Sequence, residues 1–179
     1  MKKQKLFFQH PDLYVRQCAQ MGVNMKKIIA LITGFSPLLI GYGLNQFITG
    51  SANTRLDTLL NTISIIFLLY WGWLGFLFCR LLHSNLISAV LCNLPAFITL
   101  VMILIQELVN KQYWSNPLGL ATQFFYLPLM SLTFRITPYF HYLWQSVCIS
   151  FFLMAAVFYL GGIIRKKIPE RKVQTYNEN

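Results

Sequence analysis

The chain has 179 residues, of which 56% are hydrophobic and only 11% are charged. Soluble domains have about 25% charged residues, so this composition leaves too few polar groups to cover a soluble fold and excludes one. Lysine and arginine outnumber aspartate and glutamate by 15 to 5. These basic residues gather at the two ends of the chain and form no recognisable nucleic-acid module, so we expect them to contact anionic lipid head groups and not nucleic acid.

The first part of the chain, residues 1–27, is polar and basic, and we predict a cytoplasmic tail. An uncharged apolar stretch begins directly after Lys27. A helix rises ~1.5 Å per residue, so about 20 apolar residues cross the ~30 Å hydrocarbon core of a bilayer. The stretch therefore predicts a first membrane-spanning helix at 28–49, and Pro37 is expected to kink it.

The clearest apolar stretch follows a short connection and runs between Asp57 and Arg80 without a charge. It predicts a second span at 58–79, and a third is predicted at 86–108. Aromatic residues gather toward the Arg80 end of the second span, as is typical of a membrane–water interface. They are Tyr70, Trp71, Trp73, Phe76 and Phe78.

The segment 118–142 allows two interpretations. It is long and apolar enough to cross the bilayer, but Pro128 divides it and Arg135 follows closely. If it does not cross, nearly all basic residues share one side of the membrane, as cytoplasmic loops and tails do; if it crosses, the two sides hold nearly equal numbers. We therefore favour a re-entrant or interfacial helix on the outer side, although its length also permits a fifth span.

The last span is predicted at 143–164, and a basic tail at 165–179. The predicted fold class is thus an all-α integral membrane protein in which residues 28–164 form a four-helix transmembrane bundle with one additional re-entrant or interfacial helix. Both termini are expected in the cytoplasm. The short loops and the composition favour the plasma membrane of a bacterium as the location of this multi-pass chain.

Charged and titratable residues gather at the predicted outer ends of the spans. They are Arg55, Asp57, Glu107, Lys111, Arg135 and His141. One interpretation is an outer vestibule that binds a small polar ligand or an ion, with Glu107 and Arg135 nearest the membrane. The other is that these residues mark the points where helices leave the bilayer, and this second interpretation is favoured.

Asn93 and Pro95 form the main polar feature inside a predicted span. Proline at position 95 removes a backbone donor and frees the carbonyl of Leu91 near mid-bilayer. Broken helices of this kind line binding sites in transporters. A packing kink, with Asn93 hydrogen-bonded to a neighbouring helix, is the favoured interpretation.

Motifs for catalysis, cofactors or metals are not found in the sequence. The three histidines are far apart, and the cysteines have neither C-x-x-C spacing nor the spacing of metal ligands. Protease, hydrolase, P-loop and dinucleotide fingerprints are also missing. We therefore expect a protein that is not an enzyme and has no cofactor or metal.

Two functions are compatible with these features. The first is a non-enzymatic accessory protein, which acts as the interaction partner of another membrane protein through helix contacts. The second is a compact transporter or a substrate-capturing subunit of an uptake system. The outer polar residues and the Asn93–Pro95 break support the second; the scarcity of buried polar groups and the small residues on the helix faces support the first.

Overall fold

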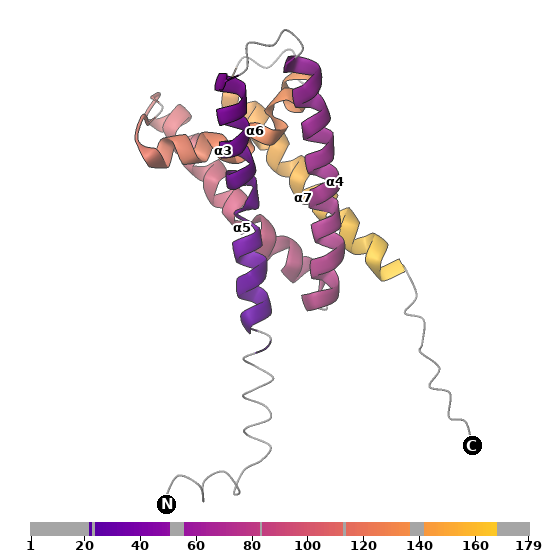
Figure 1. The fold of residues 1–179 in the computed structure, drawn as a ribbon. Coiled ribbons are helices and arrows are strands. Elements are labelled where there is room, and N and C mark those ends of the chain that lie inside the picture. Colours follow the sequence, from indigo (N-terminus) through magenta and orange to yellow (C-terminus); the bar gives the residue numbers. More distant parts are fainter. Residues whose placement is uncertain are drawn as a thin grey trace, which may run out of the picture.

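A computed structural model describes residues 22, 24–50, 56–82, 84–112, 114–136 and 142–167, and all its regular elements are helices (Figure 1). Within these residues, four helices are long and apolar enough to cross a membrane. They are Asn24–Gly50, Asp57–Leu82, Asn85–Val109 and Leu143–Lys167. The chain is therefore an all-α membrane protein with a helical bundle, and the predicted fold class is confirmed.

The first of these helices is interrupted. Residues 24–33 are helical, the backbone turns at Gly34 and Phe35, and α3 continues over Ser36–Gly50. At the turn the hydrogen bonds tighten to i→i+3, because Phe35 N–H donates to the carbonyl of Ile32 at 3.0 Å. Pro37 lacks an N–H and fits the first turn of α3, so the predicted kink becomes a break just before this proline.

Three further long helices complete the bundle. Helix α4 covers Leu56–Leu82, α5 covers Asn85–Leu104, and α7 covers Leu143–Lys167. A π-helical turn, η2 at Ile105–Val109, extends α5. The side chain of Ser84 caps α5 by accepting a hydrogen bond from Ile87 N–H at 3.4 Å, so α4 turns into α5 within a few residues.

Side-chain contacts fix the directions of the helices. Trp71 and Phe76 of α4 meet Phe158 and Arg165 of α7 respectively, so these two helices run parallel. Helix α5 runs opposite to both. Residue 24, the α4–α5 turn and the end of α7 consequently lie at one end of the bundle (Figure 1).

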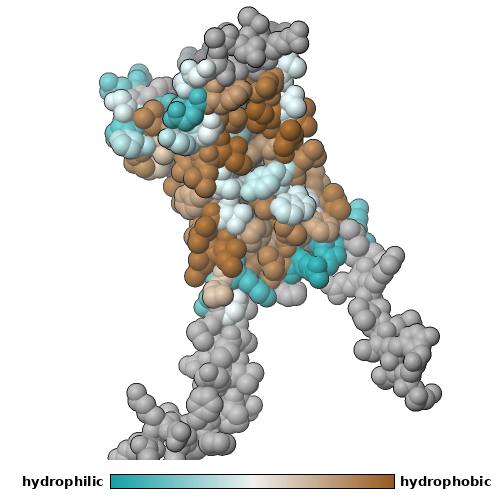
Figure 2. All heavy atoms as spheres, in the orientation of Figure 1, coloured by the Kyte–Doolittle hydropathy of each residue, from teal (hydrophilic) through white to brown (hydrophobic). Residues whose placement is uncertain are grey.

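We call this end the basic end, and the opposite one the distal end. The described side chains at the basic end that carry charge are all cationic: Lys26, Lys27, Arg80, Arg165, Lys166 and Lys167. Figure 2 shows hydrophilic residues at both ends and a broad hydrophobic belt between them. This distribution is the one that a bilayer requires of a spanning bundle.

Helix α6, Pro117–Ile136, is the additional helix. It crosses the bundle at an angle in the distal half, and it is not among the four helices that meet the length and hydropathy of a span (Figure 1). Its partners on the long helices, such as Gly41, Ser64 and Ser150, all lie on the distal side of mid-bundle. The helix continues through Pro128 without a break.

Neighbouring helices cover the backbone that Pro128 perturbs. Pro128 is fully buried, and Ser64 Oγ donates a 2.7 Å hydrogen bond to its carbonyl. The carbonyl of Phe124, which loses its usual donor at Pro128, packs directly on Gly41 of α3, where a Cβ would overlap it. Polar backbone at membrane depth is thus satisfied or covered by protein, as an apolar solvent demands.

Glycines set the close contact of α4 with α7, the most extensive helix pair in the bundle. A Cβ at Gly161 would overlap the carbonyl oxygen of Gly72, and one at Gly75 would overlap the carbonyl of Phe158. Small residues of this kind let the backbones of membrane helices approach each other. The sequence analysis expected flat faces on the first span instead, at Gly34, Gly41 and Gly43; Gly43 is exposed and has no such contact.

The aromatic cluster of α4 is only partly at the lipid surface. Trp71 is fully buried, and Phe78 is buried as well, whereas Trp73 is 57% exposed. The expectation of an interfacial aromatic belt is therefore wrong for Trp71 and Phe78. Their rings fill the core against α7 and α5, because a helix in the middle of a bundle turns half of its circumference toward protein.

Candidate functional site

Glu107 belongs to the π-turn at the distal end, where its side chain reaches the start of α7. The backbone N–H of Trp144 donates a 2.8 Å hydrogen bond to Glu107 Oε2. The first N–H groups of a helix lack internal partners, and a carboxylate there also complements the helix dipole. Glu107 therefore caps α7, and this contact explains the position of the acid in structural terms.

The other predicted vestibule residues are spread over the distal end. Asp57 is exposed in the first turn of α4, and Arg135 is exposed in the last turn of α6. Lys111 follows η2 with a positive φ of 51°. Arg55 and His141 lie outside the described residues. A ligand site formed by these six positions stays a prediction.

Asn93 lies in the middle of α5 and joins it to α4. Trp71 Nε1 donates a 3.3 Å hydrogen bond to Asn93 Oδ1, and Asn93 Nδ2 donates to the carbonyl of Ala89 at 2.9 Å. Both residues are buried. The amide therefore bridges two helices at mid-membrane depth, as the packing interpretation of this residue expects.

Pro95 lies two residues further, opposite the interruption of the first span. A Cβ at Gly34 would come within 3.0 Å of Pro95 Cγ and would approach the carbonyl of Cys92 to 2.5 Å. Cys92 Sγ in turn donates to the carbonyl of Ala30 at 3.4 Å. Two irregular stretches of helix thus face each other near the middle of the bundle, and the absence of a side chain at Gly34 allows the contact.

Helix α7 borders two open grooves on the surface of the bundle. The α5–α7 groove has a volume of about 290 Å³ and is lined by Ala89, Val90, Asn93, Leu94, Phe97, Phe151 and Ala155. The α4–α7 groove is larger, at about 430 Å³, and is lined by Leu68, Leu69, Gly72, Trp73, Phe76, Val157, Leu160, Gly161 and Ile164. Both lie within the hydrophobic belt, and neither was foreseen from the sequence.

Gln106 is a buried polar residue that sequence reasoning missed. It is fully buried within η2, where Nε2 donates to Thr122 Oγ1 and Oε1 accepts from the backbone N–H of Trp114, each at 3.4 Å. Its amide ties the π-turn to α6 and to the loop before it. The available signal was a glutamine beside Glu107 at the end of an apolar run, and the pattern alone assigns both to the helix exit.

The described residues contain no group of three or more histidine, cysteine or acidic side chains close enough to hold a metal ion. No protein-family model matches the chain, and neither the curated proteins nor the solved structures include a significant match. The argument for function therefore rests on the bundle's own surfaces.

Proposed function

We propose that the chain is a non-enzymatic accessory subunit that binds a transmembrane helix of another membrane protein. The observation that carries this proposal is the α5–α7 groove, which exposes small residues and one amide at mid-membrane depth. Ala89 and Ala155 keep its walls low. A partner helix can therefore approach closely, and close approach supplies most of the association energy of helices in lipid.

The core of the bundle supports an interaction role over a transport role. Large side chains such as Trp71, Tyr126 and Phe158 occupy its centre and are fully buried. Tyr126 donates a 2.6 Å hydrogen bond to the carbonyl of Ala96, and Ser150 Oγ donates to Thr133 Oγ1 at 3.4 Å. These polar groups are engaged in contacts between helices, which is the arrangement of a packed scaffold.

A site-specific photo-crosslinker tests this function in the native membrane. Val90 lines the groove and is 57% exposed, whereas Ile98 on the same helix is 50% exposed and does not line it. We expect a crosslinker at position 90 to give one defined protein adduct that a crosslinker at position 98 does not give. Equal adducts at the two positions, or lipid adducts alone at position 90, contradict the proposal.

A matched pair of alanines on α7 sharpens the test. Ala155→Leu fills the groove, while Ala156→Leu adds the same volume on an exposed position beside it. We expect Ala155→Leu to lower the yield of the position-90 adduct by roughly fivefold or more, which corresponds to ~1 kcal/mol of lost binding. Ala156→Leu is expected to leave the yield unchanged.

We also propose an orientation for this subunit: the basic end faces the cytoplasm of a bacterial cell, both termini are cytoplasmic, and the terminal basic residues contact anionic lipid head groups. The cationic side chains at the basic end support this, since cytoplasmic segments retain lysine and arginine. Reporter fusions after Asn179 and after Lys111 test it. A cytoplasmic reporter is expected to be active after Asn179 and inactive after Lys111, and the reverse pattern overturns the orientation.

A compact transporter or substrate-capturing subunit is the second candidate. The observation in its favour is the pair of irregular stretches at Gly34–Phe35 and Pro95, because interrupted helices near mid-bilayer expose backbone groups to substrates in transporters. A thermal-shift screen of the purified chain against amino acids, vitamins and inorganic ions tests it. A saturable stabilisation that Pro95→Ala abolishes would favour this candidate over the first.

A further inference from the structure

The α4–α7 groove differs from the other groove in where it leads. Its lining begins near Leu68 at mid-membrane and continues along both helices to Phe76 and Ile164, close to the basic end. The floor is backbone, because Gly72 and Gly161 meet there without side chains between them. Leucine and aromatic side chains form the walls. The groove is thus a narrow apolar channel, open to the bilayer and aligned with it.

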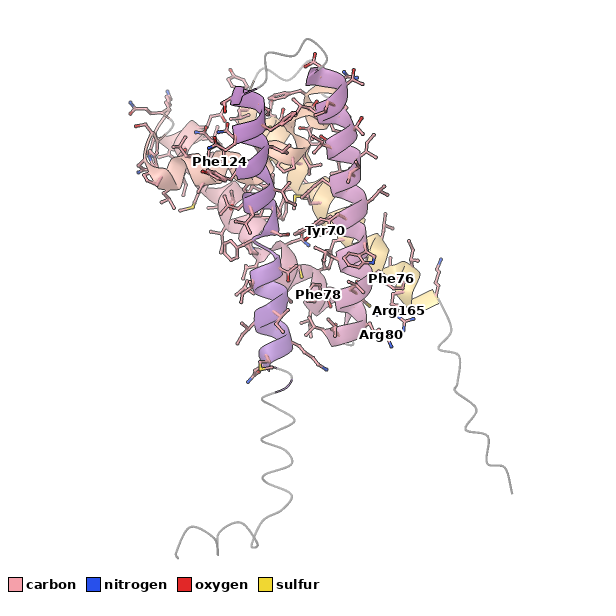
Figure 3. The ribbon with its side chains drawn as sticks, viewed as in Figure 1. Tyr70, Phe76, Phe78, Arg80, Phe124 and Arg165 are labelled. Atoms are coloured by element: carbon pink, nitrogen blue, oxygen red, sulfur yellow. The ribbon has the colours of Figure 1, made fainter. Side chains whose placement is uncertain are left out.

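Cationic groups lie where this channel ends. The guanidinium of Arg165 lies 5.6 Å from the centre of the Phe76 ring, and Phe76 is part of the groove wall. Arg80 is in the last turn of α4, and Lys166 follows Arg165 in the last turn of α7. Figure 3 shows Phe76, Arg80 and Arg165 together at this end of the bundle.

No acidic side chain among the described residues balances these charges at the basic end. The two described acids, Asp57 and Glu107, lie in the first turn of α4 and in η2, both at the distal end. An occupant of the groove therefore needs an apolar body and a negative head at the depth of Arg165. A phospholipid with net negative charge has both parts in this order.

We propose that the α4–α7 groove binds one acyl chain of an anionic phospholipid, whose phosphate is held by Arg165 and Arg80. A transmembrane helix fits less well here. Such a helix is about 10–12 Å wide, and docked over this channel it would cover the cationic end without supplying a negative charge. The lipid phosphate offers charge-assisted hydrogen bonds to guanidinium groups, which hold planar anions in a fork geometry.

Trp73 provides the reporter for this site, because it lines the groove and is 57% exposed. The full-length chain is reconstituted in mixed vesicles of phosphatidylglycerol and phosphatidylcholine, in which either one or the other lipid carries bromine on its acyl chain. The difference between the emission of the wild type and that of Trp73→Phe isolates Trp73. We expect stronger quenching of Trp73 by the brominated anionic lipid than by the brominated zwitterionic lipid at the same mole fraction.

Charge variants assign the preference to the proposed head-group site. Arg165→Gln is expected to lower the preference for the anionic lipid roughly fivefold, the effect of one basic residue near a membrane surface. Arg165→Lys should retain most of the preference. Lys27→Gln removes the same charge from the same end of the bundle, on the first span, and should leave it unchanged.

Three results would overturn the lipid site. Equal quenching by the two brominated lipids would mean that the groove does not select charge. A loss in Lys27→Gln as large as that in Arg165→Gln would assign the preference to general surface charge. Protection of Trp73 from both lipids would mean that protein covers the groove. Lipid retention in native mass spectrometry, measured on the folded fraction of each variant, separates these results from misfolding.

Discussion

The two grooves beside α7 have similar walls and different ends. Both are lined almost entirely by aliphatic and aromatic side chains within the hydrophobic belt. The α5–α7 groove is centred at mid-membrane, and its polar lining residue is Asn93. The α4–α7 groove extends to the basic end, where Arg165 lies over the ring of Phe76. The same helix therefore presents an amide on one side and a guanidinium near the other.

This contrast shows what selects an occupant inside a bilayer. Lipid chains are as apolar as leucine, so burial of apolar surface does not distinguish a lipid from a partner helix. Shape and the few polar groups decide instead. Small residues at mid-depth favour a helix, and cationic groups at head-group depth favour an anionic lipid.

The largest expected effect comes from the contact that holds both grooves in place. Gly161→Ala puts a methyl group into the backbone of Gly72, so α4 and α7 must separate. Overpacking of this kind costs about 1–3 kcal/mol. We expect a lower thermal unfolding midpoint in detergent and the loss of both the crosslink and the lipid preference.

Gly43→Ala is the matched control, because the position of its Cβ has no atom within 4 Å. Alanine is intrinsically better than glycine in a helix, so this variant should be neutral or slightly more stable. Equal unfolding midpoints for the two variants would mean that the glycine contact does not limit the packing of α4 on α7.

The next effect tests whether the grooves are independent. Ala155 and Arg165 are ten positions apart on one helix, or about 15 Å along its axis. We expect Ala155→Leu to lower only the crosslink yield and Arg165→Gln to lower only the lipid preference, each by roughly fivefold. The double variant should show both losses, additive within about 0.5 kcal/mol. A crosslink yield that falls in Arg165→Gln alone would join the two sites into one.

A smaller effect is expected at the base of the α5–α7 groove. A double-mutant cycle with Trp71→Phe and Asn93→Ala isolates the 3.3 Å hydrogen bond between the two side chains. Couplings of this type in membrane proteins average about 0.6 kcal/mol and reach about 1.7 kcal/mol. Thermal or denaturant unfolding of the four proteins measures the coupling. A value near zero would leave Asn93 available to a partner and not to the core.

The smallest effect is expected at the cap of α7, far from both grooves. Glu107→Gln keeps an oxygen that can accept from Trp144 N–H but removes the charge. Loss of the interaction between the charge and the helix dipole is worth about 0.3–1 kcal/mol. Unfolding measurements should detect this shift while crosslink yield and lipid preference stay at the values of the wild type. A change in either readout would show that the cap controls the position of α7 along both grooves.

Much of the fold was predictable because membrane spans obey a local rule. Length and lack of charge placed four spans, and the helices of the structure overlap all of them, with α7 continuing to Lys167 beyond the predicted end at residue 164. The distribution of basic residues also favoured keeping α6 from crossing. Each of these inferences needs only composition along a short window, which a bilayer of constant thickness translates directly into structure.

The candidate sites were far less predictable, because they depend on residues distant in sequence. Glu107 looked like part of an outer vestibule, and the structure gives it the start of α7 as its partner. Trp71 looked interfacial, and the structure buries it. Which face of an apolar helix meets protein is invisible to hydropathy when every face is apolar, so the grooves appear only in three dimensions.

The sequence by itself thus determined that this protein lives in a membrane, where its spans lie and which ends are basic. Tertiary structure alone decided that Gly72 and Gly161 meet, that the amide of Asn93 bridges to Trp71, and that Arg165 stands at the mouth of a groove. The physical reason is the solvent. A bilayer selects residues by depth, which one chain segment reveals, whereas lateral packing depends on pairs of faces that only the assembled bundle brings together.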